Sequence, residues 1–458
     1  MTAPAQRNAI GTDFTQGEVM PLLLRFFLPF LLANLLNSIY NTVDTIIIGQ
    51  FVGSSGIVAV TMGGKMLNLF TNIGLAFAGG GQVLISQLVG AKRREEINAT
   101  IGTLFSEMLG LSVIFAAVTL LLSKRIITWL NTPEEAFESA VVYLRITCVG
   151  LPLIFGYNAV SSVLRGMGDS KSPLVFIAIA AFINLVGDLV FIIAFRMGAA
   201  GTAVATVLGQ GLSLLFSLIV LYRRREHFGF DFKLSSFAID RPKLRVMMRL
   251  GYPVALRSCC ITITQLVLMG YVNLYGLTEA TAYSIGDKIV HLANIFSMAA
   301  KQAAGAMVGQ NIGAGKPERV KKIVRAAAVI TLSAALVLSA VALLFPRAVF
   351  GAFTHDGAVL AFAPAFMLIS ALIFLLSAVM CPYEAVITGT GNAGLSLLGG
   401  LLDGVVFRIC FSFLFAVYAG MGVRGFFLGD ALARLGPILV GGVYYYSGAW
   451  KRRKKLLD

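Results

Sequence analysis

The chain has 458 residues, of which 57% are hydrophobic and 13% are charged, and its mean hydropathy is +0.84. Soluble globular proteins carry about 25% charged residues, so the composition indicates a polytopic membrane protein and argues against a soluble enzyme. The formal net charge is +15. We expect no nucleic-acid partner, because the Lys and Arg residues stand in short clusters between apolar stretches, a pattern that sets membrane topology.

Twelve apolar stretches follow one another along the chain, and each is long enough to cross about 30 Å of hydrocarbon as a helix. They lie at residues 22–48, 54–88, 98–122, 137–164, 172–195, 199–222, 246–275, 281–311, 323–345, 358–386, 395–418 and 424–447. The sequence therefore predicts an all-α integral membrane protein that contacts the lipid bilayer through twelve transmembrane helices.

The longest polar connection, residues 223–245, separates the first six stretches from the last six. We expect an N-lobe at 22–222 and a C-lobe at 246–447. A cytoplasmic N-terminal segment at 1–21, which lacks the apolar region of a signal peptide, and a basic cytoplasmic tail at 448–458 complete the chain. Lys and Arg gather in every second loop and in the tail, which favours both termini inside and insertion in the cytoplasmic (inner) membrane.

The two halves resemble each other at a constant offset. A shift of 223 residues places Gln87 on Gln310, and it carries the following Gly-Ala pair with it. The same shift places Lys65 on Lys288. A fixed offset over separate loops indicates an internal repeat. Because both halves have the same orientation by charge, we expect two six-helix lobes related by a parallel pseudo-two-fold repeat, a build used by secondary transporters.

The first stretch carries a polar stripe. Asn34, Asn37, Asn41 and Asp44 recur at steps of 3, 4 and 3, so they share one face of a helix. An ionisable residue inside a membrane span is costly and normally faces a bundle interior, which makes Asp44 the first functional candidate. Pro29 in the same stretch favours a kink. Two interpretations remain: a hinge whose bending depends on the state of Asp44, and a static bend.

The fifth stretch adds Asn184 and Asp188, four residues apart on one face. Counting 1.5 Å per residue from the expected span ends places Asp44, Thr206 and Tyr143 at about the same depth. Two carboxylates with amide and hydroxyl oxygens suit Na⁺. They equally suit H⁺, because burial and a neighbouring like charge favour a protonated carboxyl group. The alternative is structural hydrogen bonding between helices.

Other polar residues are weaker candidates. Asn158 lies deeper in the fourth stretch and is expected to play a supporting role. In the second half, the shift places Val267 at the Asp44 position and Phe411 at the Asp188 position. Glu384 and Asp403 are the best candidates there for substrate contact, followed by His291. The charged residues of this half include both signs and are expected to be mostly paired.

No motif indicates an enzyme. The chain has no glycine-rich phosphate loop that ends in Lys-Ser or Lys-Thr, so ATP-driven transport within this chain is not expected. The five cysteines lie in apolar stretches without metal-site spacing, and we expect no cofactor. A channel or a receptor is a further alternative, which the internal repeat and the absence of a soluble signalling domain disfavour.

Several motifs together resemble the MATE (multidrug and toxic compound extrusion) family over nearly the whole chain. They are YNTVDTIIIGQFVG with Tyr40 and Asp44, the paired Gln-x-x-Gly-Ala loops after the second and eighth stretches, and LRGMGDSKSP followed by NLVGD. The resemblance implies twelve helices in two lobes. It also implies export of organic cations and drugs in exchange for H⁺ or Na⁺, with a cation site at Asp44, Asn184, Asp188 and Thr206 near Tyr40 and Tyr143.

The resemblance leaves some choices open. Family members that place a coupling carboxylate in the second lobe do so in spans seven and eight or ten, and here only Glu384 could substitute. The substrate cavity is expected to involve Asn37, Asn41, Glu384, Asp403 and His291, with small-molecule organic cations or drugs as partners and a monomeric protein. The alternative function is a flippase for lipid-linked saccharides from the same wider superfamily, which would need a strongly cationic cavity.

Overall fold

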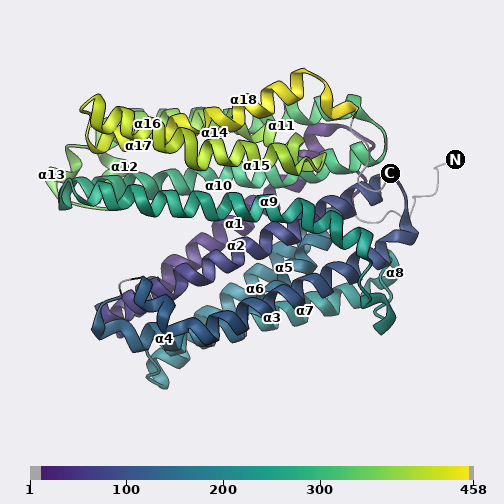
Figure 1. Ribbon diagram of the computed structural model, residues 1–458, viewed down its shortest axis with the longest axis horizontal. Helices are drawn as coiled ribbons and strands as arrows, with labels where there is room; N and C mark the ends of the chain where they lie inside the picture. The colour runs from purple at the N-terminus through teal and green to yellow at the C-terminus, as the bar shows by residue number, and fades with distance from the viewer. Residues whose placement is uncertain (1–11, 131, 453–458) are drawn as a thin grey trace. The chain divides into compact units, whose positions relative to one another are not determined.

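The computed structural model describes residues 12–130 and 132–452, without the side chains at 41, 45, 46, 49, 54 and 227. Within these residues the chain is helical and has no strand (Figure 1). It divides into two compact units. The first unit comprises Met1–Phe14 and Leu32–Tyr252, and the second comprises Thr15–Leu31 and Pro253–Asp458. The lobe boundaries expected from the sequence remain a prediction.

The helices of the first half include five of 18 residues or more. Their bounds are α1 (Val19–Phe51), α2 (Ser54–Gly90), α3 (Ile97–Trp129), α4 (Glu134–Val149), α5 (Leu151–Gly166), α6 (Lys171–Asp188), α7 (Ala199–Arg223) and α8 (Arg225–Phe228). Two short 3₁₀ turns, η1 (Arg94–Glu96) and η3 (Leu234–Phe237), and one π-helical turn, η2 (Leu189–Ala194), accompany them. Helix α2 packs against α3, α4, α5 and α7.

The second half repeats this plan with more interruptions. Its helices are α9 (Arg241–Asn273), α10 (Leu277–Gly313), α11 (Pro317–Leu344), α12 (Pro346–Gly351), α13 (Gly357–Leu360), α14 (Ala363–Gly389), α15 (Ala393–Leu401), α16 (Phe407–Phe413), α17 (Val423–Ala433) and α18 (Leu435–Tyr446). Two π-helical turns, η4 (Leu402–Val406) and η5 (Leu414–Tyr418), flank α16, and the 3₁₀ turn η6 (Ala449–Lys451) follows α18. Helix α14 packs against α10, α11, α17 and α18.

Ten helical segments of the described chain are long and apolar enough to cross a membrane. The pair α4 and α5 becomes an eleventh span if it is counted as one, and it is bent by 47°. Helix α10 has 37 residues but is not among the apolar spans, since it carries charged residues such as Lys288 and Lys301. These twelve segments correspond to the twelve stretches expected from the sequence.

The bend between α4 and α5 departs from the single span expected at 137–164. Gly150 separates the two helices, and Pro152 stands in the first turn of α5. Proline has no backbone N–H to donate and is tolerated in a first turn but not inside a helix. Consequently the chain changes direction here. The difference in membrane depth between Tyr143 and Asn158 cannot be counted along one straight helix.

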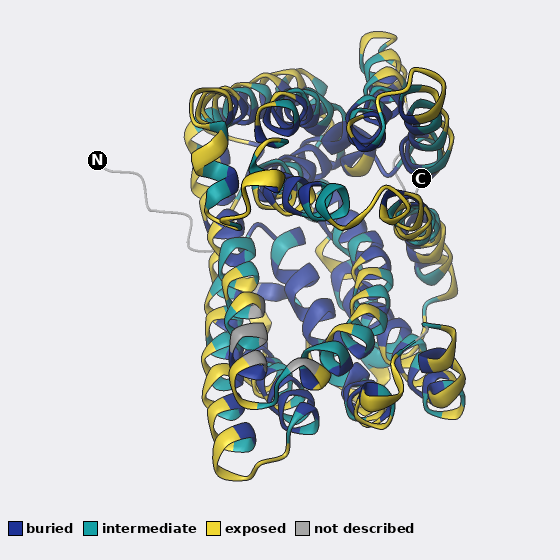
Figure 2. Cartoon of the chain, turned by 90° about the vertical axis from the view of Figure 1, so that its left-hand side faces the viewer, coloured by how far each residue is buried: buried dark blue, intermediate teal, exposed yellow. Residues whose placement is uncertain are grey.

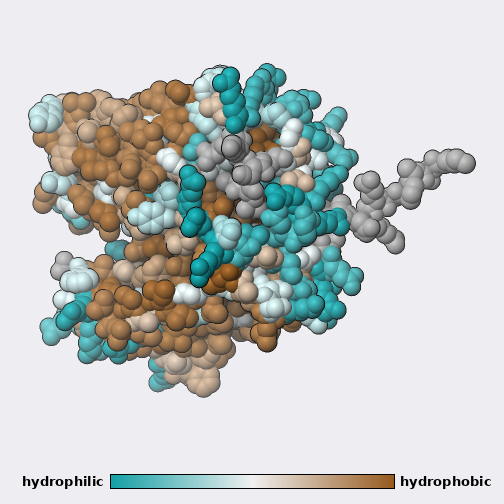
Figure 3. All heavy atoms as spheres, turned by 45° about the vertical axis from the view of Figure 1, so that its right-hand side comes forward, coloured by the Kyte–Doolittle hydropathy of each residue, from teal (hydrophilic) through white to brown (hydrophobic). Residues whose placement is uncertain are grey.

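Large hydrophobic side chains cover the outer faces of the helices. Figure 2 shows exposed residues along these faces, and Leu121 and Leu277 are 84% and 85% exposed. In Figure 3 hydrophobic residues cover much of the visible surface. Such exposure suits a bilayer, because lipid tails are as apolar as the side chains that face them.

Local backbone geometry reproduces the internal repeat. Gly198 before α7 has φ 58° and ψ −137°, and Gly422 before α17 has φ 59° and ψ −137°. The positive φ favours glycine at both positions. The residue before each glycine donates its backbone N–H to the carbonyl six residues earlier, at 2.9 Å for Met197 and 3.1 Å for Met421. The two halves therefore enter these helices by the same turn.

The polar connection between the halves is held against α3 within the first unit. Ser106 donates its hydroxyl to the carbonyl of Phe237 at 2.6 Å, and the backbone N–H of Asp240 donates to Thr103 Oγ1 at 3.1 Å. The Phe105 ring lies 6.1 Å from the Phe237 ring. We call residues 231–240 the docked linker.

Candidate functional site

The acids of the first unit lie on α1 and at the end of α6. Asp188 is the last residue of α6, is fully buried, and is followed directly by the π-helical turn η2. Asp44 is half-buried on α1. Packing of Ile47 and Ile48 against Ile192 of η2 brings α1 to this end of α6. π-Helical turns are often found at functional sites.

Asn184 connects α6 to α7. Its amide fits best with the oxygen toward Thr206, where it accepts hydrogen bonds from the backbone N–H and from Oγ1, both at 3.2 Å. The amide nitrogen then donates to Asp188 Oδ2 at 3.2 Å. This orientation is assigned from the hydrogen-bonding pattern. Asn184, Asp188 and Thr206, three residues of the expected cation site, thus form one connected group.

Asp44 joins this group through the second carboxyl group. The carboxyl groups of Asp44 and Asp188 lie within hydrogen-bonding reach of each other, and a hydrogen bond between them would require a proton on one of them. In the described chain, Oδ1 of each acid is buried without a hydrogen-bond partner. Buried carboxyl oxygens are normally satisfied, so these two oxygens suit a bound proton or cation.

Two tyrosines lie beside the acids. Tyr40 on α1 and Tyr143 on α4 are both within electrostatic range of Asp44 and Asp188. Tyr143 is buried against α2, where a methyl group added at Gly63 would overlap its ring. The absence of a side chain at Gly63 therefore lets Tyr143 lie close to α2. The structure brings both expected supporting tyrosines to the acids.

Several expected residues are not in this group. Asn158 is buried on α5, beyond the bend, and its Nδ2 has no hydrogen-bond partner in the described residues. Pro29 lies inside α1, two residues before the end of the α1 segment that belongs to the second unit. Asn37 and His291 are exposed. The Asn41 side chain lies outside the described residues.

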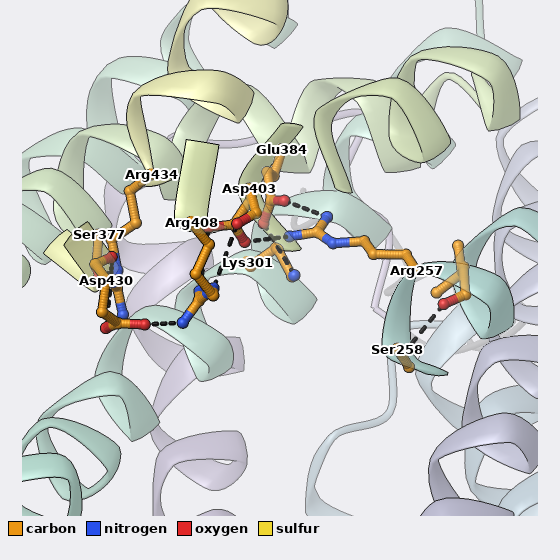
Figure 4. Close-up of polar contacts among 10 residues, drawn as sticks. Arg257, Ser258, Lys301, Ser377, Glu384, Asp403, Arg408, Asp430 and Arg434 are labelled. Carbon is orange, nitrogen blue, oxygen red and sulfur yellow. Dashed lines mark hydrogen bonds and ion pairs between the residues drawn. The ribbon is translucent and has the colours of Figure 1, made fainter. Parts of the chain in front are cut away.

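In the second unit the charged residues alternate in sign along a line of contacts (Figure 4). Lys301 Nζ lies 3.0 Å from Glu384 Oε2, and Arg257 contacts both Glu384 Oε1 and, at 3.8 Å, Asp403 Oδ2. Asp403 also contacts Arg408 at 3.3 Å. The line continues through Asp430 to Arg434. We call Lys301, Glu384, Arg257, Asp403, Arg408, Asp430 and Arg434 the ion-pair chain.

Small residues and a π-helical turn position the ion-pair chain. A methyl group at Gly400 of α15 would overlap the Arg257 side chain, and one at Gly404 would overlap Ile261, so α9 lies close to this segment. Asp403 stands in the π-helical turn η4 between the two glycines. The two expected substrate contacts, Glu384 and Asp403, are thus buried and ion-paired.

Sequence reasoning missed one buried acid. Glu107 lies on the buried face of α3, and neither carboxyl oxygen has a hydrogen-bond partner among the described residues. The sequence did contain a sign of this buried acid, since Glu107 is the only acid in the apolar stretch 98–122. No group of three or more His, Cys, Asp or Glu side chains in the described chain could hold a metal ion. A cation in the first unit would therefore also use the amide and hydroxyl oxygens.

The geometry can now be compared with known proteins. The family model MatE matches residues 29–190 and again residues 253–414. The chain belongs to the MatE family. The two matches divide this MatE protein into the same two halves as the internal repeat, and they start at Pro29 and Pro253. As a member of the MATE transporters it is a multi-pass integral membrane transporter and not an enzyme.

Curated relatives and solved structures agree with the assignment to this family. This MatE protein is 30% identical over 446 residues to the "Probable multidrug resistance protein YpnP" of Bacillus subtilis (strain 168), with 96% of this chain and 98% of the relative covered. It is 22% identical to the "Probable multidrug resistance protein NorM" of Thermotoga maritima, covering 96% and 95%. A solved "multidrug resistance MATE family transporter of the MOP superfamily" matches with a TM-score of 0.91 at 20% identity, covering 98% and 100%.

Proposed function

We propose that this protein exports organic cations and drugs in exchange for H⁺ or Na⁺ by alternating access. The observation that carries the proposal is the pair formed by Asp44 and Asp188, whose carboxyl groups lie within hydrogen-bonding reach of each other while one oxygen of each is buried without a partner among the described residues. Acids inside a membrane protein mark ion pathways. The names of the curated relatives, which refer to multidrug resistance and export, support the same function.

The coupling ion would bind at Asp44, Asn184, Asp188 and Thr206. A proton shared by the two acids would give them one net negative charge, and removal of the proton would place two like charges side by side. Na⁺ could instead be held by the carboxylate oxygens with the Thr206 hydroxyl and the Asn184 amide oxygen. Either ion couples to export if it binds one conformation of the transporter more tightly than the other.

Other residues would support the cycle. Tyr40 and Tyr143 would hydrogen-bond to the acids in one of their charge states, and Pro29 would allow α1 to bend, since it interrupts the backbone hydrogen bonds of the helix. Asn158 would contribute a polar contact on α5. We infer a monomer in the cytoplasmic membrane with both termini inside.

Transport of a fluorescent cation into or out of proteoliposomes tests the proposal. A Na⁺ gradient and a pH gradient are imposed separately, and the gradient that drives the dye identifies the coupling ion. We expect Asp44→Asn and Asp188→Asn to abolish driven transport while the protein still migrates as a folded species in gel filtration. Normal exchange by both variants would show that Asp44 and Asp188 do not form the coupling site.

The flippase alternative has less support. A cavity for a pyrophosphate-linked sugar would need several unpaired cations. Arg257 and Arg408 are instead each in contact with two acids, and Arg434 is in contact with one.

A further inference from the structure

Four aromatic side chains pack together where α18 ends in the second unit. The rings of Tyr383, Tyr445 and Tyr446 lie 5.3, 5.9 and 6.2 Å from one another between centroids. The Trp450 ring stacks on the Tyr445 ring at 6.1 Å between centroids, with the two planes 3° apart. We call Tyr383, Tyr445, Tyr446 and Trp450 the aromatic cluster.

The turn after α18 holds Trp450 in place. Gly448 has φ 70° and ψ 8°, a left-handed conformation that favours glycine, and its backbone N–H donates to the Tyr445 carbonyl at 3.3 Å. The indole N–H of Trp450 donates to the same carbonyl at 3.0 Å. Since Trp450 is only 1% exposed, the chain beyond α18 is folded back against the helix.

Cations from two helices converge on the aromatic cluster. Lys451 Nζ lies 5.7 Å from the centre of the Trp450 ring. Arg325 of α11 lies within electrostatic range of Tyr445. Helix α14 packs against both α11 and α18, and this packing brings together two basic segments that are far apart in the sequence.

These cations are not paired with acids of the described chain. Lys322, Arg325 and Lys451 are exposed, and none of them forms an ion pair within the described residues. By contrast Arg257, in the interior of the same unit, contacts two acids. The positive charge around the aromatic cluster is therefore available to a partner.

On α11 the cations stand at the end of a lipid-facing surface. Lys322 and Arg325 share one helix face with Val329 and Leu336, and both apolar side chains are more than half exposed. The helix has 28 residues, so at about 42 Å it exceeds the hydrocarbon core by about 12 Å. Because the opposite end exposes Leu344, the excess falls at the basic end and places the two cations near the lipid headgroups.

On α18 the lipid-facing surface ends in the aromatic cluster. Leu439, Val443 and Tyr446 recur at steps of 4 and 3 on one helix face, and each is more than half exposed. The Tyr383 hydroxyl donates to the Tyr446 hydroxyl at 3.4 Å, which leaves the O–H of Tyr446 able to donate to another acceptor. A molecule bound here therefore meets apolar side chains on one side, and cations with a hydroxyl donor on the other.

We propose that the aromatic cluster and the cations around it bind the headgroup phosphate of an anionic phospholipid. The Arg325 guanidinium holds two phosphate oxygens at once, with Lys451 and the Tyr446 hydroxyl beside it, and the acyl chains lie along the exposed faces of α11 and α18. Cations that only set membrane topology need no packed surroundings, whereas these cations flank stacked and hydrogen-bonded rings. The proposal concerns a lipid and is independent of the exported substrate and of the coupling ion.

Quenching of Trp450 fluorescence by brominated lipid tests the proposal. The chain has two tryptophans, so Trp129→Phe leaves Trp450 as the only one, inside the aromatic cluster. The full-length Trp129→Phe protein is reconstituted in phosphatidylcholine bilayers that contain a rising fraction of phosphatidylglycerol or phosphatidylcholine brominated in the acyl chains. We expect the brominated phosphatidylglycerol to quench at an about fivefold lower fraction, the factor supplied by the attraction of one basic residue for anionic lipid.

Matched variants locate the lipid. Arg325→Gln should abolish the preference, so that both brominated lipids quench at the same fraction, and Arg325→Lys should retain it because the charge is kept. Arg225→Gln is the control for general surface charge, since Arg225 is exposed and lies 4.9 Å from the centre of the Tyr222 ring in the first unit. Equal quenching by the two lipids in the parent protein, or an equal loss of preference in Arg225→Gln and Arg325→Gln, would overturn the proposal.

A soluble competitor distinguishes a lipid site from a phosphate site. The compound sn-glycerol 3-phosphate carries the phosphate of the headgroup without acyl chains. Added in excess, it should not reverse the quenching, because the acyl chains bind through the apolar faces of α11 and α18. Recovery of Trp450 fluorescence would mean that the aromatic cluster binds a soluble phosphate, and the assignment to a lipid would be wrong.

Discussion

The two units treat their buried acids in opposite ways. In the first unit Asp44 and Asp188 lie beside each other, and each has one buried oxygen without a hydrogen-bond partner in the part of the chain that the structure describes. In the second unit Glu384, Asp403 and Asp430 are each held between two cations. Acids that lack cations can change their charge by binding an ion, whereas fully paired acids resist such a change. This difference supports our proposal that the coupling ion binds in the first unit.

The largest expected effect separates two buried glutamates. Glu384→Gln should destabilise the protein by about 3–5 kcal/mol, because it removes the acid that contacts Arg257 most closely, and the Arg257 side chain is largely buried. Glu107→Gln is the matched control, since Glu107 is equally buried but has no hydrogen-bond partner among the described residues, and it should cost less than about 1 kcal/mol. Thermal unfolding in detergent measures both. Similar losses for the two variants would break the comparison.

A steric change should perturb the ion-pair chain without altering any charge. Gly400→Ala introduces a methyl group that overlaps the Arg257 side chain, and overpacking of this kind costs about 1–3 kcal/mol. Gly394→Ala on the same helix, where the added methyl would make only an ordinary contact at 3.9 Å, should be neutral. If both variants unfold at the same temperature as the wild-type protein, the close approach of Arg257 to Gly400 is not required for stability.

A hydroxyl in the first unit should matter less for stability. Thr206→Val removes one hydrogen bond to Asn184 and should cost about 0.5–1.5 kcal/mol. Thr202→Val, one turn earlier on α7 and buried without a hydroxyl partner, should be neutral or stabilising. Only Thr206→Val should also weaken binding of the coupling ion, which would raise the ion concentration at half-maximal transport. An equal effect of both valines would place Thr206 outside the site.

Neutralising an acid of the first unit should barely change stability. Asp188→Asn replaces a carboxyl group that has no cation beside it in the described residues with an amide of the same shape, so the free energy of unfolding should change by less than about 1 kcal/mol. The unfolding temperatures of Asp188→Asn and Glu384→Gln, measured side by side, test this contrast. A loss as large as that of Glu384→Gln would show that Asp188 is structural.

The smallest effect is expected outside the membrane spans. Burial opposes the charged form of Asp240, but hydrogen bonds from Lys243 and its charge outweigh burial and hold the pKa of Asp240 below its usual value. A lowered pKa stabilises the folded state above the unfolded pKa of about 3.9 and loses that contribution as the pH falls. Asp240→Asn should therefore speed trypsin cleavage at Lys233 at pH 7, and the difference in unfolding temperature from wild type should shrink below about pH 4. Equal cleavage rates would mean that Asp240 does not hold the docked linker.

Much of the first-unit site was predictable from the sequence. Counting along helices placed Asp44, Asn184, Asp188 and Thr206 at one depth, because a regular rise of about 1.5 Å per residue converts position into height. The bend at Gly150 was not predicted, since a long apolar run gives no sign of where a helix breaks. The π-helical turn after Asp188 was missed for the same reason.

The second unit was harder to predict because partners matter more than depth. Glu384 looked like a free acid in an apolar stretch, but its environment depends on Arg257, which lies 127 residues away in the chain. Mixed signs indicated pairing, and that expectation is confirmed for the members of the ion-pair chain. Which cation contacts which acid follows from helix packing, including the approach at Gly400, and a single sequence does not contain it.

One contact at the start of the chain has a consequence for synthesis. Within the second unit, Lys316 donates to the carbonyl of Thr15, and Arg319 donates to the carbonyls of Gln16 and Gly17, across 301 to 303 residues of sequence. At about 5–20 residues per second, the ribosome needs about 15–60 s to reach these partners. Segment 15–17 therefore emerges from the ribosome well before Lys316 and Arg319, and these hydrogen bonds form only after most of the protein has been made.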